Sequence, residues 1–419
     1  MSPARLLYTV ALVVLTPLAL VRLVWRARRQ REYLEHVGER FGAYRVRADL
    51  PVIWVHAVSV GETHAAHPLI RALRTAHPDH RIVLTHMTPT GRRTGEQLFG
   101  NEVARVYLPY DLPWTVERFL RHFRPKVGVL IETEVWPNLL ARCAGTHIPV
   151  VLANARMSER SARGYARVAR LTREAMGSLA AVGAQSEADA QRLTRLGARR
   201  VEVTGNIKFD RLPSGADLAL ARSFRARTAK RFVFLAASTR AGEEELVLDA
   251  LTGLEADILL ALVPRHPQRF DEVAALLDKR RLPHQRRSDE QPVRADTRVW
   301  LGDSMGELFS YYAACDVAFV GGSLLPLGGQ NLLEPLALGK PVLIGPHTFN
   351  FAEASEAAVQ AGAAIRVVDS IGLRQMVRAL RADSDRCRSL GEAGINFMKR
   401  HAGATQRTVA LIESALRTT

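Results

Sequence analysis

The sequence predicts an α/β protein made of two doubly wound parallel sheets, and three observations predict it. Short apolar runs alternate with longer amphipathic stretches, which is the pattern of strand, helix and strand in a parallel sheet. A polar stretch at residues 204–230 interrupts the alternation, which then begins again. The 419 residues are enough for each half to bury its own core. We therefore expect two Rossmann-like halves facing a cleft, with ligands at the carboxyl ends of the strands.

The strands of the two halves can be placed by their apolar runs. In the first half we expect strands at 51–58, 81–85, 103–108, 127–131, 149–153, 180–184 and 200–203. Helices are expected from about residue 61, at 114–123 and at 186–196. In the second half we expect strands at 232–236, 257–263, 297–301, 317–320 and 341–344. The resulting domains are 31–213 and 214–419, and a last helix at about 404–416 can pack back on the first domain.

The N-terminal segment 1–30 has the composition of a membrane anchor with a basic stem. Residues 6–21 are apolar apart from Tyr8, Thr9, Thr16 and Pro17, and arginines follow this run. A secretory signal would carry its basic residues before the apolar run. The arginines after it predict a single-pass anchor whose following domains lie on the cytoplasmic side. The alternative is a buried N-terminal helix.

Composition limits the partners and the chemistry. The formal net charge is +16, which allows nucleic acid, a phospholipid surface or a phosphorylated glycolipid as an anionic partner. Aromatic residues are only 6% and form no stripe among the basic residues, which argues against nucleic acid. The 3 cysteines form no CxxC pair, so we expect no disulfide scaffold and no zinc site.

Charged residues follow strands of the first half at three places. Glu62 opens a helix after the first strand, where it is either a base or simply a residue that the helix dipole favours. Glu132 and Glu134 end a buried strand, and we expect an extended backbone to point both to one side. Lys208 lies in the connection between the halves, either to bind an anion or as a solvated surface lysine.

The loops of the second half are rich in glycine and polar residues. No GxGxxG or GxxxxGK[ST] sequence is present, which argues against a dehydrogenase or a phosphate-loop kinase. We expect the hydroxyls and amides of 237–244 to meet a phosphate, and Arg265, set between two prolines, to bind an anion. The loop 328–335 enters a helix and places Glu334 where a carboxylate can meet ribose hydroxyls.

Together these segments resemble the 3-deoxy-D-manno-octulosonic acid (Kdo) transferases, which are inner-membrane glycosyltransferases of the GT-B fold. The matching words are HAVSVGE at 56–62, TPTG at 88–91, ETEVWPN at 132–138, GNIKFD at 205–210, PRHPQRF at 264–270, GDSMGE at 302–307, GGSLLPLGGQNLLEP at 321–335 and GPHTFNF at 345–351. The resemblance covers the chain from the N-terminal anchor to near the C-terminus. One departure is Gln330, where many relatives carry histidine.

The resemblance implies an inverting transfer of Kdo from CMP-Kdo to a tetraacylated lipid A precursor, at the cytoplasmic side of the inner membrane. It makes Glu62 the general base, with Glu132 and Lys208 supporting the transition state. It implies that CMP-Kdo, a substrate, is held by these residues: Pro264, Arg265, Met305, Gly306, Glu307, Asn331, Leu332, Leu333 and Glu334. The family needs no metal and no cofactor.

Two other functions remain open on the residues alone. One is another GT-B transferase or a sugar-nucleotide epimerase, such as a lipid A disaccharide synthase. The anchor and the words HAVSVGE and ETEVWPN argue against it. The other is a membrane-tethered, non-catalytic binder of anions, which depends on the net charge alone.

Overall fold

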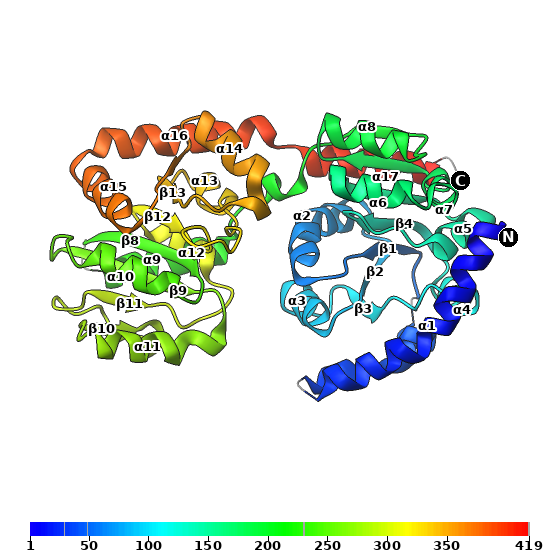
Figure 1. Ribbon diagram of the computed structural model, residues 1–419, viewed down its shortest axis with the longest axis horizontal. Coiled ribbons are helices and arrows are strands. Elements are labelled where there is room, and N and C mark those ends of the chain that lie inside the picture. The colour runs from blue at the N-terminus through cyan, green and yellow to red at the C-terminus, as the bar shows by residue number, and fades with distance from the viewer. Residues whose placement is uncertain (29, 48, 229–230, 418–419) are drawn as a thin grey trace. The chain divides into compact units, whose positions relative to one another are not determined.

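The computed structural model describes residues 1–419 except 29, 48, 229–230 and 418–419 (Figure 1). The chain divides into two compact units. Unit 1 contains Met1–Asp210 and Ala402–Thr419, and unit 2 contains Arg211–His401. The division lies close to the end of the expected first domain at residue 213, and the C-terminal helix belongs to unit 1.

Unit 1 is built on a parallel sheet of seven strands in the order β3-β2-β1-β4-β5-β6-β7. The strands are β1 Val52–His56, β2 Arg81–His86, β3 Ala104–Tyr107, β4 Pro125–Ile131, β5 Val150–Ala155, β6 Ala181–Ala184 and β7 Val201–Val203. The helices are α1 Pro3–Ala27, α2 Val60–Ala76, α3 Pro89–Phe99, α4 Pro113–Phe123, α5 Pro137–Gly145, α6 Glu159–Ala166, α7 Ala169–Gly177, α8 Glu187–Arg195 and α17 Ala404–Arg417. The short 3₁₀ turns are η1 Arg31–Leu34, η2 Val37–Phe41 and η3 Ile207–Asp210.

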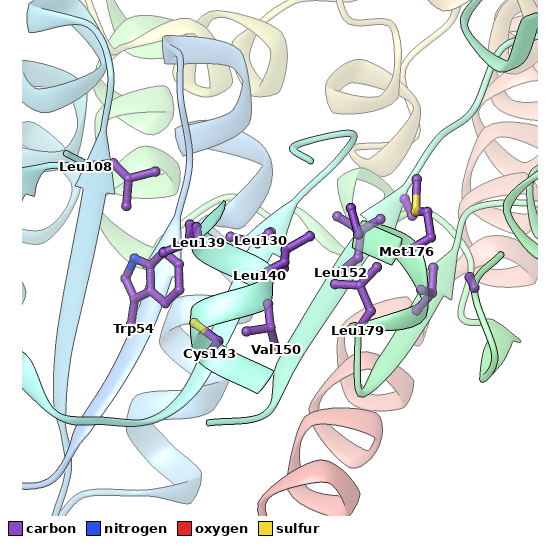
Figure 2. Close-up of a cluster of buried hydrophobic side chains, with 14 of the residues drawn as sticks. Trp54, Leu108, Leu130, Leu139, Leu140, Cys143, Val150, Leu152, Met176 and Leu179 are labelled. Carbon is purple, nitrogen blue, oxygen red and sulfur yellow. The ribbon is translucent and has the colours of Figure 1, made fainter. Parts of the chain in front are cut away.

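Buried side chains cover both faces of this sheet. On one face Trp54, Leu130 and Leu152 project from neighbouring strands and pack against residues of α5 and α7, as Figure 2 shows. The indole N–H of Trp54 donates to the Thr85 hydroxyl at 2.7 Å, so the one polar atom of the buried ring keeps a hydrogen-bond partner. Gly128 lies beneath the same ring, where a Cβ would come within 2.6 Å of it. The strand pairing therefore requires glycine there.

The C-terminal helix α17 completes the other face. Leu411 and Ile412 are buried in the cluster formed by β1, β4 and β5. The Asp210 carboxylate accepts hydrogen bonds from the N–H groups of Gly403 and Thr405, which begin this helix. These bonds join the two segments of unit 1, Met1–Asp210 and Ala402–Thr419.

Unit 2 has a second parallel sheet of seven strands in the order β10-β11-β9-β8-β12-β13-β14. The strands are β8 Phe232–Thr239, β9 Ile258–Pro264, β10 His284–Arg286, β11 Val299–Leu301, β12 Val317–Val320, β13 Val342–Ile344 and β14 Ala364–Arg366. The helices are α9 Gly215–Arg227, α10 Glu243–Leu251, α11 Phe270–Lys279, α12 Leu308–Ala314, α13 Leu333–Ala337, α14 Ala352–Gln360, α15 Ser370–Ala382 and α16 Ser384–His401. The 3₁₀ turns are η4 Pro267–Arg269, η5 Arg287–Asp289 and η6 Phe349–Phe351.

The two parallel sheets confirm the predicted fold class, and each expected strand is present. Sequence analysis missed the edge strands β10 and β14, because their three-residue runs include polar side chains and are only partly buried. It also missed α9, which lies within the polar stretch and buries only Ala221 and Phe224. A helix with so narrow an apolar face has little periodicity to detect.

The helix α1 extends the predicted apolar segment at both ends. It is long and apolar enough to cross a membrane by length and composition, and only 11% of its most apolar stretch is buried. The Ser2 hydroxyl caps its first turn by accepting a hydrogen bond from the Arg5 N–H at 3.2 Å. Pro17 interrupts the helical hydrogen bonds near its middle.

Candidate functional site

The strand order of each sheet identifies where ligand-binding loops should lie. In unit 1 the order reverses between the neighbouring strands β1 and β4, and in unit 2 it reverses between β8 and β12. Loops diverge to opposite faces at such a point, which leaves a crevice at the carboxyl ends of the two strands. Glu62 follows β1 and Glu132 follows β4. In unit 2 the loops 240–242 and 321–332 occupy the equivalent positions.

Glu62 lies in the first turn of α2. Its Oε2 accepts a hydrogen bond from the Val58 N–H at 2.7 Å, and its Oε1 accepts one from the Ser59 hydroxyl at 3.1 Å. Burial raises the pKa of the Glu62 carboxyl to about 7; the Val58 N–H opposes this shift, and the negative charges of Glu134 and Glu132 add to it. A carboxylate with this pKa can accept a proton near neutral pH.

Glu132 is oriented by a left-handed turn. The prediction that an extended backbone points Glu132 and Glu134 to one side is wrong, because Glu132 has a φ of 65°. Its N–H donates to the Ala153 carbonyl at 2.9 Å, which holds the turned residue at the end of the sheet. In this conformation its Oε1 lies 2.8 Å from the Nζ of Lys208. The Lys208 and Glu132 side chains are 32% and 27% exposed, so the pair remains open to a ligand.

Glu134 provides a second negative charge near Glu62. Its Oε2 accepts a hydrogen bond from the indole N–H of Trp136 at 3.0 Å. Burial raises the pKa of the Glu134 carboxyl, and the nearby charge of Glu132 adds to the shift, while the Trp136 hydrogen bond opposes it. Three carboxylates are thus grouped at one edge of the sheet. Only Glu132 has a cationic partner among the described residues.

Asp111 supports this loop, and sequence analysis did not single it out. Its carboxylate accepts hydrogen bonds from the N–H groups of Asn138 and Leu139 at 3.0 and 2.8 Å, at the beginning of α5. Burial raises its pKa to about 6. The sequence did carry a signal for it. Asp111 lies three positions before the helix expected at 114–123, and an acidic residue close to a helix start often binds backbone N–H groups.

Asn154 positions the segment that carries Lys208, and it too was not predicted from the sequence. It lies fully buried in β5 with a φ of 54°, and its Oδ1 accepts a hydrogen bond from the Ile207 N–H at 3.1 Å. Within the described residues its Nδ2 has no partner. Because Ile207 precedes Lys208, this bond positions the 3₁₀ turn that carries the lysine. A polar side chain inside an apolar strand was the available signal.

A possible metal-binding group lies elsewhere in unit 1. His77, Asp79 and His80 have potential ligand atoms within 4.8 Å of one another. They follow the C-terminal end of α2, whereas Glu62 is in its first turn. This group is therefore separate from the three carboxylates.

In unit 2 a buried glutamate binds the backbone amides of the loop after β12. The Glu243 carboxylate accepts hydrogen bonds from the N–H groups of Gly322, Ser323 and Leu324 at 2.6 to 3.0 Å. Glu243 is fully buried, so it joins the loop after β8 to the loop after β12 and leaves these amides no capacity for a ligand. The expectation that the hydroxyls and amides of 237–244 meet a phosphate stays a prediction; of these hydroxyls, that of Thr239 donates to Glu244 at 2.9 Å.

Arg265 follows β9 with its guanidinium partly exposed. Its N–H donates to the Thr239 carbonyl at 2.9 Å, which places it beside the end of β8. Neither Arg265 nor Arg240 has a side-chain hydrogen bond or ion pair within the described part of the chain. Burial lowers the pKa of His266, and the charges of Arg265 and Arg240 lower it further. This edge of the second sheet is therefore electropositive and suited to an anion.

The Met305–Glu307 segment follows β11. The Arg287 guanidinium donates to both oxygens of Glu307, at 2.8 and 3.1 Å, and the Ser304 hydroxyl donates to it as well. Gly306 has a φ of 82°, which allows the chain to turn between the exposed Met305 and the paired glutamate. A ligand contact here would come from the Met305 side chain or from backbone atoms.

The Asn331–Glu334 segment leads into α13. The Glu334 carboxylate is buried and accepts hydrogen bonds from Arg211 at 2.5 Å and from Asn331 at 3.2 Å. The side chains of Leu332 and Leu333 are buried in unit 2, so these two residues can reach a ligand only through their backbone atoms. The segment is thus a preformed turn with one carboxylate already paired.

Comparisons with known proteins show relatives along nearly the whole chain. Residues 35–211 match the family described as 3-deoxy-D-manno-octulosonic-acid transferase (kdotransferase). The chain is 42% identical to the 3-deoxy-D-manno-octulosonic acid transferase of Bordetella pertussis, over 98% of this chain and 99% of that protein. It is 38% identical to the transferase of the same name from Haemophilus influenzae, over 98% and 99%.

A solved structure shows the same fold at low identity. The UDP-GlcNAc 2-epimerase of Neisseria meningitidis, bound to UDP-GlcNAc, matches 87% of this chain and 100% of its own with a TM-score of 0.59 and 15% identity. At that identity the likeness concerns the fold alone.

Proposed function

The chain belongs to the 3-deoxy-D-manno-octulosonic acid (Kdo) transferase family, and from this premise we propose that it transfers Kdo from CMP-Kdo to a tetraacylated lipid A precursor. A sugar hydroxyl of the acceptor attacks the anomeric carbon of Kdo, and the bond from that carbon to the phosphate oxygen breaks. CMP leaves with the bonding electron pair, and the hydroxyl proton passes to the enzyme. Attack from the face opposite CMP inverts the anomeric centre.

Glu62 is the base that takes this proton. The observation that supports it is a carboxyl with a pKa of about 7 at the β1/β4 reversal, held by the Val58 N–H and the Ser59 hydroxyl. A base must be deprotonated before reaction and must bind the proton firmly as the new bond forms, which a pKa near the working pH achieves.

Lys208 supplies positive charge to the reacting groups. Its pair with Glu132 fixes the Nζ in the absence of substrate, at 2.8 Å from Oε1. The Kdo carboxylate and the departing phosphate are both anionic, and the charge on the phosphate grows as the bond breaks. A cation already held in place stabilises that charge without reorganisation.

Unit 2 holds the CMP part of the donor. Arg265, beside the end of β8 and without a partner among the described residues, is the residue proposed to bind the phosphate. Pro264, Met305, Gly306, Glu307 and Asn331–Glu334 form the remainder of the proposed contacts, with Leu332 and Leu333 acting through their backbone atoms.

The acceptor is a lipid, so the enzyme must work at a membrane. We assign it to the cytoplasmic side of the inner membrane, attached through α1 and the arginines that follow it. The sequence predicted a single crossing by this helix. Its contacts, described in the next subsection, favour attachment without crossing.

The decisive experiment measures transfer from freshly generated CMP-Kdo to a detergent-dispersed lipid A precursor. Wild type, Glu62→Gln and the control Glu96→Gln, which changes an exposed glutamate of α3, are compared. We expect a loss of about 10²- to 10⁴-fold in kcat for Glu62→Gln with CMP affinity retained, and no change for the control. Equal rates for all three would remove Glu62 from the reaction. Absence of wild-type product beside an active reference enzyme would refute the proposed function.

A further inference from the structure

Side-chain hydrogen bonds connect the first third of α1 to the rest of unit 1. The Ser2 hydroxyl donates to the Glu174 carboxylate in α7. The Tyr8 hydroxyl donates to Asp111 Oδ2 at 3.0 Å, and Asn138 Nδ2 donates to Thr9 Oγ1 at 3.0 Å. Figure 1 shows the beginning of the helix beside α5 and α7, which it contacts.

These contacts are incompatible with a helix that crosses the bilayer. A crossing that puts Ser2 on the far side separates it from Glu174 by the thickness of the membrane, about 30 Å. Keeping the contacts during a crossing would instead carry Glu174 and Asp111 into hydrocarbon, where carboxylates are costly. The helix can keep its partners only if both of its ends stay on the side of unit 1.

Apolar side chains are exposed around much of α1, and the most exposed of them form one stripe. Leu7, Val10, Val14, Leu18 and Val21 recur at intervals of three and four residues, so they share one helix face. Leu7, Val14 and Val21 are 72%, 68% and 66% exposed. A continuous exposed apolar surface of this length is suited to lipid rather than to water. It is the polar contacts at the start of the helix that set its orientation.

Basic groups lie near both ends of the stripe. A cavity of about 280 Å³ beside the first turn is lined in part by Arg5, Arg173 and Arg199. Arg173 and Arg199 have no side-chain hydrogen bond or ion pair among the described residues, whereas the charge of Arg5 acts on the Asp111 carboxylate. At the other end Arg22 and Arg28 are exposed. This pairing of an apolar stripe with cations is complementary to a leaflet that contains anionic phospholipids.

We propose that α1 lies in the plane of the membrane, with the stripe in the cytoplasmic leaflet and both helix ends on the cytoplasmic side. The occupant of the stripe is an anionic phospholipid surface. This attachment places unit 1, and with it Glu62, against the leaflet in which an acylated acceptor is dissolved. The inference deepens the membrane attachment proposed above but does not depend on the transfer reaction.

Cysteine labelling tests the topology without substrates. In a chain with Cys387→Ser, which removes the partly exposed thiol, single cysteines are introduced as Pro3→Cys and Arg28→Cys, both at exposed positions. A membrane-impermeant maleimide is applied to spheroplasts and to inverted inner-membrane vesicles, with detergent-solubilised samples as the reactivity control. We expect both thiols to react in inverted vesicles and neither in spheroplasts. Reaction of the Pro3→Cys thiol in spheroplasts, with Arg28→Cys reacting only in inverted vesicles, would overturn the proposal.

Vesicle flotation tests the stripe itself. The double variant Val14→Gln/Leu18→Gln is compared with Leu212→Gln/Val368→Gln, which changes two equally exposed apolar residues of unit 2. We expect the stripe variant to bind phosphatidylcholine vesicles containing phosphatidylglycerol at least about 10-fold more weakly, and the control to bind as wild type. Unchanged binding would overturn the proposal. So would a dimer in solution that the stripe variant abolishes, because the stripe would then bind a second copy. Transfer activity in detergent, measured in parallel, tests the proposed function separately.

Discussion

Replacing Glu134 by glutamine should move the pH dependence of the reaction while leaving the base in place. Glu134 accepts a hydrogen bond from Trp136, and a glutamine carbonyl can accept the same bond. The change therefore removes one negative charge near Glu62 with little change of shape. Since that charge helps to raise the pKa of Glu62 to about 7, its removal lowers this pKa.

The expected size follows from the rank of the causes. Burial is the largest cause of the raised Glu62 pKa, and the charge of Glu134 is a smaller one that exceeds that of Glu132. We therefore expect Glu134→Gln to lower the Glu62 pKa by a minor part of its rise from 4.5 to about 7; a change of one pH unit corresponds to about 1.4 kcal/mol. Because the base is active when deprotonated, the acid limb of kcat/KM moves to lower pH by this amount.

The assay is kcat/KM for transfer from CMP-Kdo to the dispersed lipid A precursor, measured across the pH range around 7. Glu96→Gln serves as the control, because Glu96 is exposed and is not among the groups that shift the Glu62 pKa. Its profile should superimpose on that of wild type. An acid limb that stays in place in Glu134→Gln, or moves to higher pH, would refute the electrostatic coupling. An acid limb that persists unchanged in Glu62→Gln would show that another group is titrating.

Three further outcomes are expected. Lys208→Met should lower kcat by about 10²- to 10³-fold, with Lys208→Arg less affected, because the developing charge loses its fixed cation. Gly321→Ala should lower the unfolding temperature and weaken CMP binding, because a Cβ would lie 2.8 Å from two carbonyl oxygens, whereas Gly215→Ala, with nothing within 4 Å, should be tolerated. Thermal stability should change little between pH 7 and 5, because two opposing proton uptakes offset each other. The unfolded chain protonates His56 and His86, whose folded pKa values burial lowers to about 3 and about 4, while the folded chain protonates Glu62 and Asp111, whose pKa values burial raises to about 7 and about 6.

Each of these outcomes has a clear contrary result. A Lys208→Met enzyme with wild-type kcat would confine the lysine to a structural role. Equal stability of the Gly321 and Gly215 variants would mean that the loop after β12 can relax around the added methyl group. A steep fall of the unfolding temperature between pH 7 and 5, in buffers of matched ionic strength, would contradict the raised pKa values of Glu62 and Asp111.

Much of the fold followed from the sequence because the period of its apolar residues is set by local geometry. A buried parallel strand must be apolar on both faces, so β1 (VIWVH) and the VGVLI run of β4 could be recognised from the sequence alone. The same alternation placed Glu62 and Glu132 just after strands, where parallel sheets bind ligands. The weakly apolar elements β10, β14 and α9 escaped recognition because tertiary packing, not periodicity, holds them.

The residues that position the site could be identified only from the tertiary structure. The sequence alone determined the two sheets, the apolar N-terminal helix and the charged residues that follow the strands. Only the folded chain could show that Glu132 turns left-handed to meet Lys208, which is 76 positions away. Only the folded chain could show that Glu243 takes up the amides of the loop after β12, or that Tyr8 ties α1 to Asp111. The physical reason is that hydrophobic periodicity is a local property, whereas the pairing of buried polar groups depends on which distant segments the fold brings together.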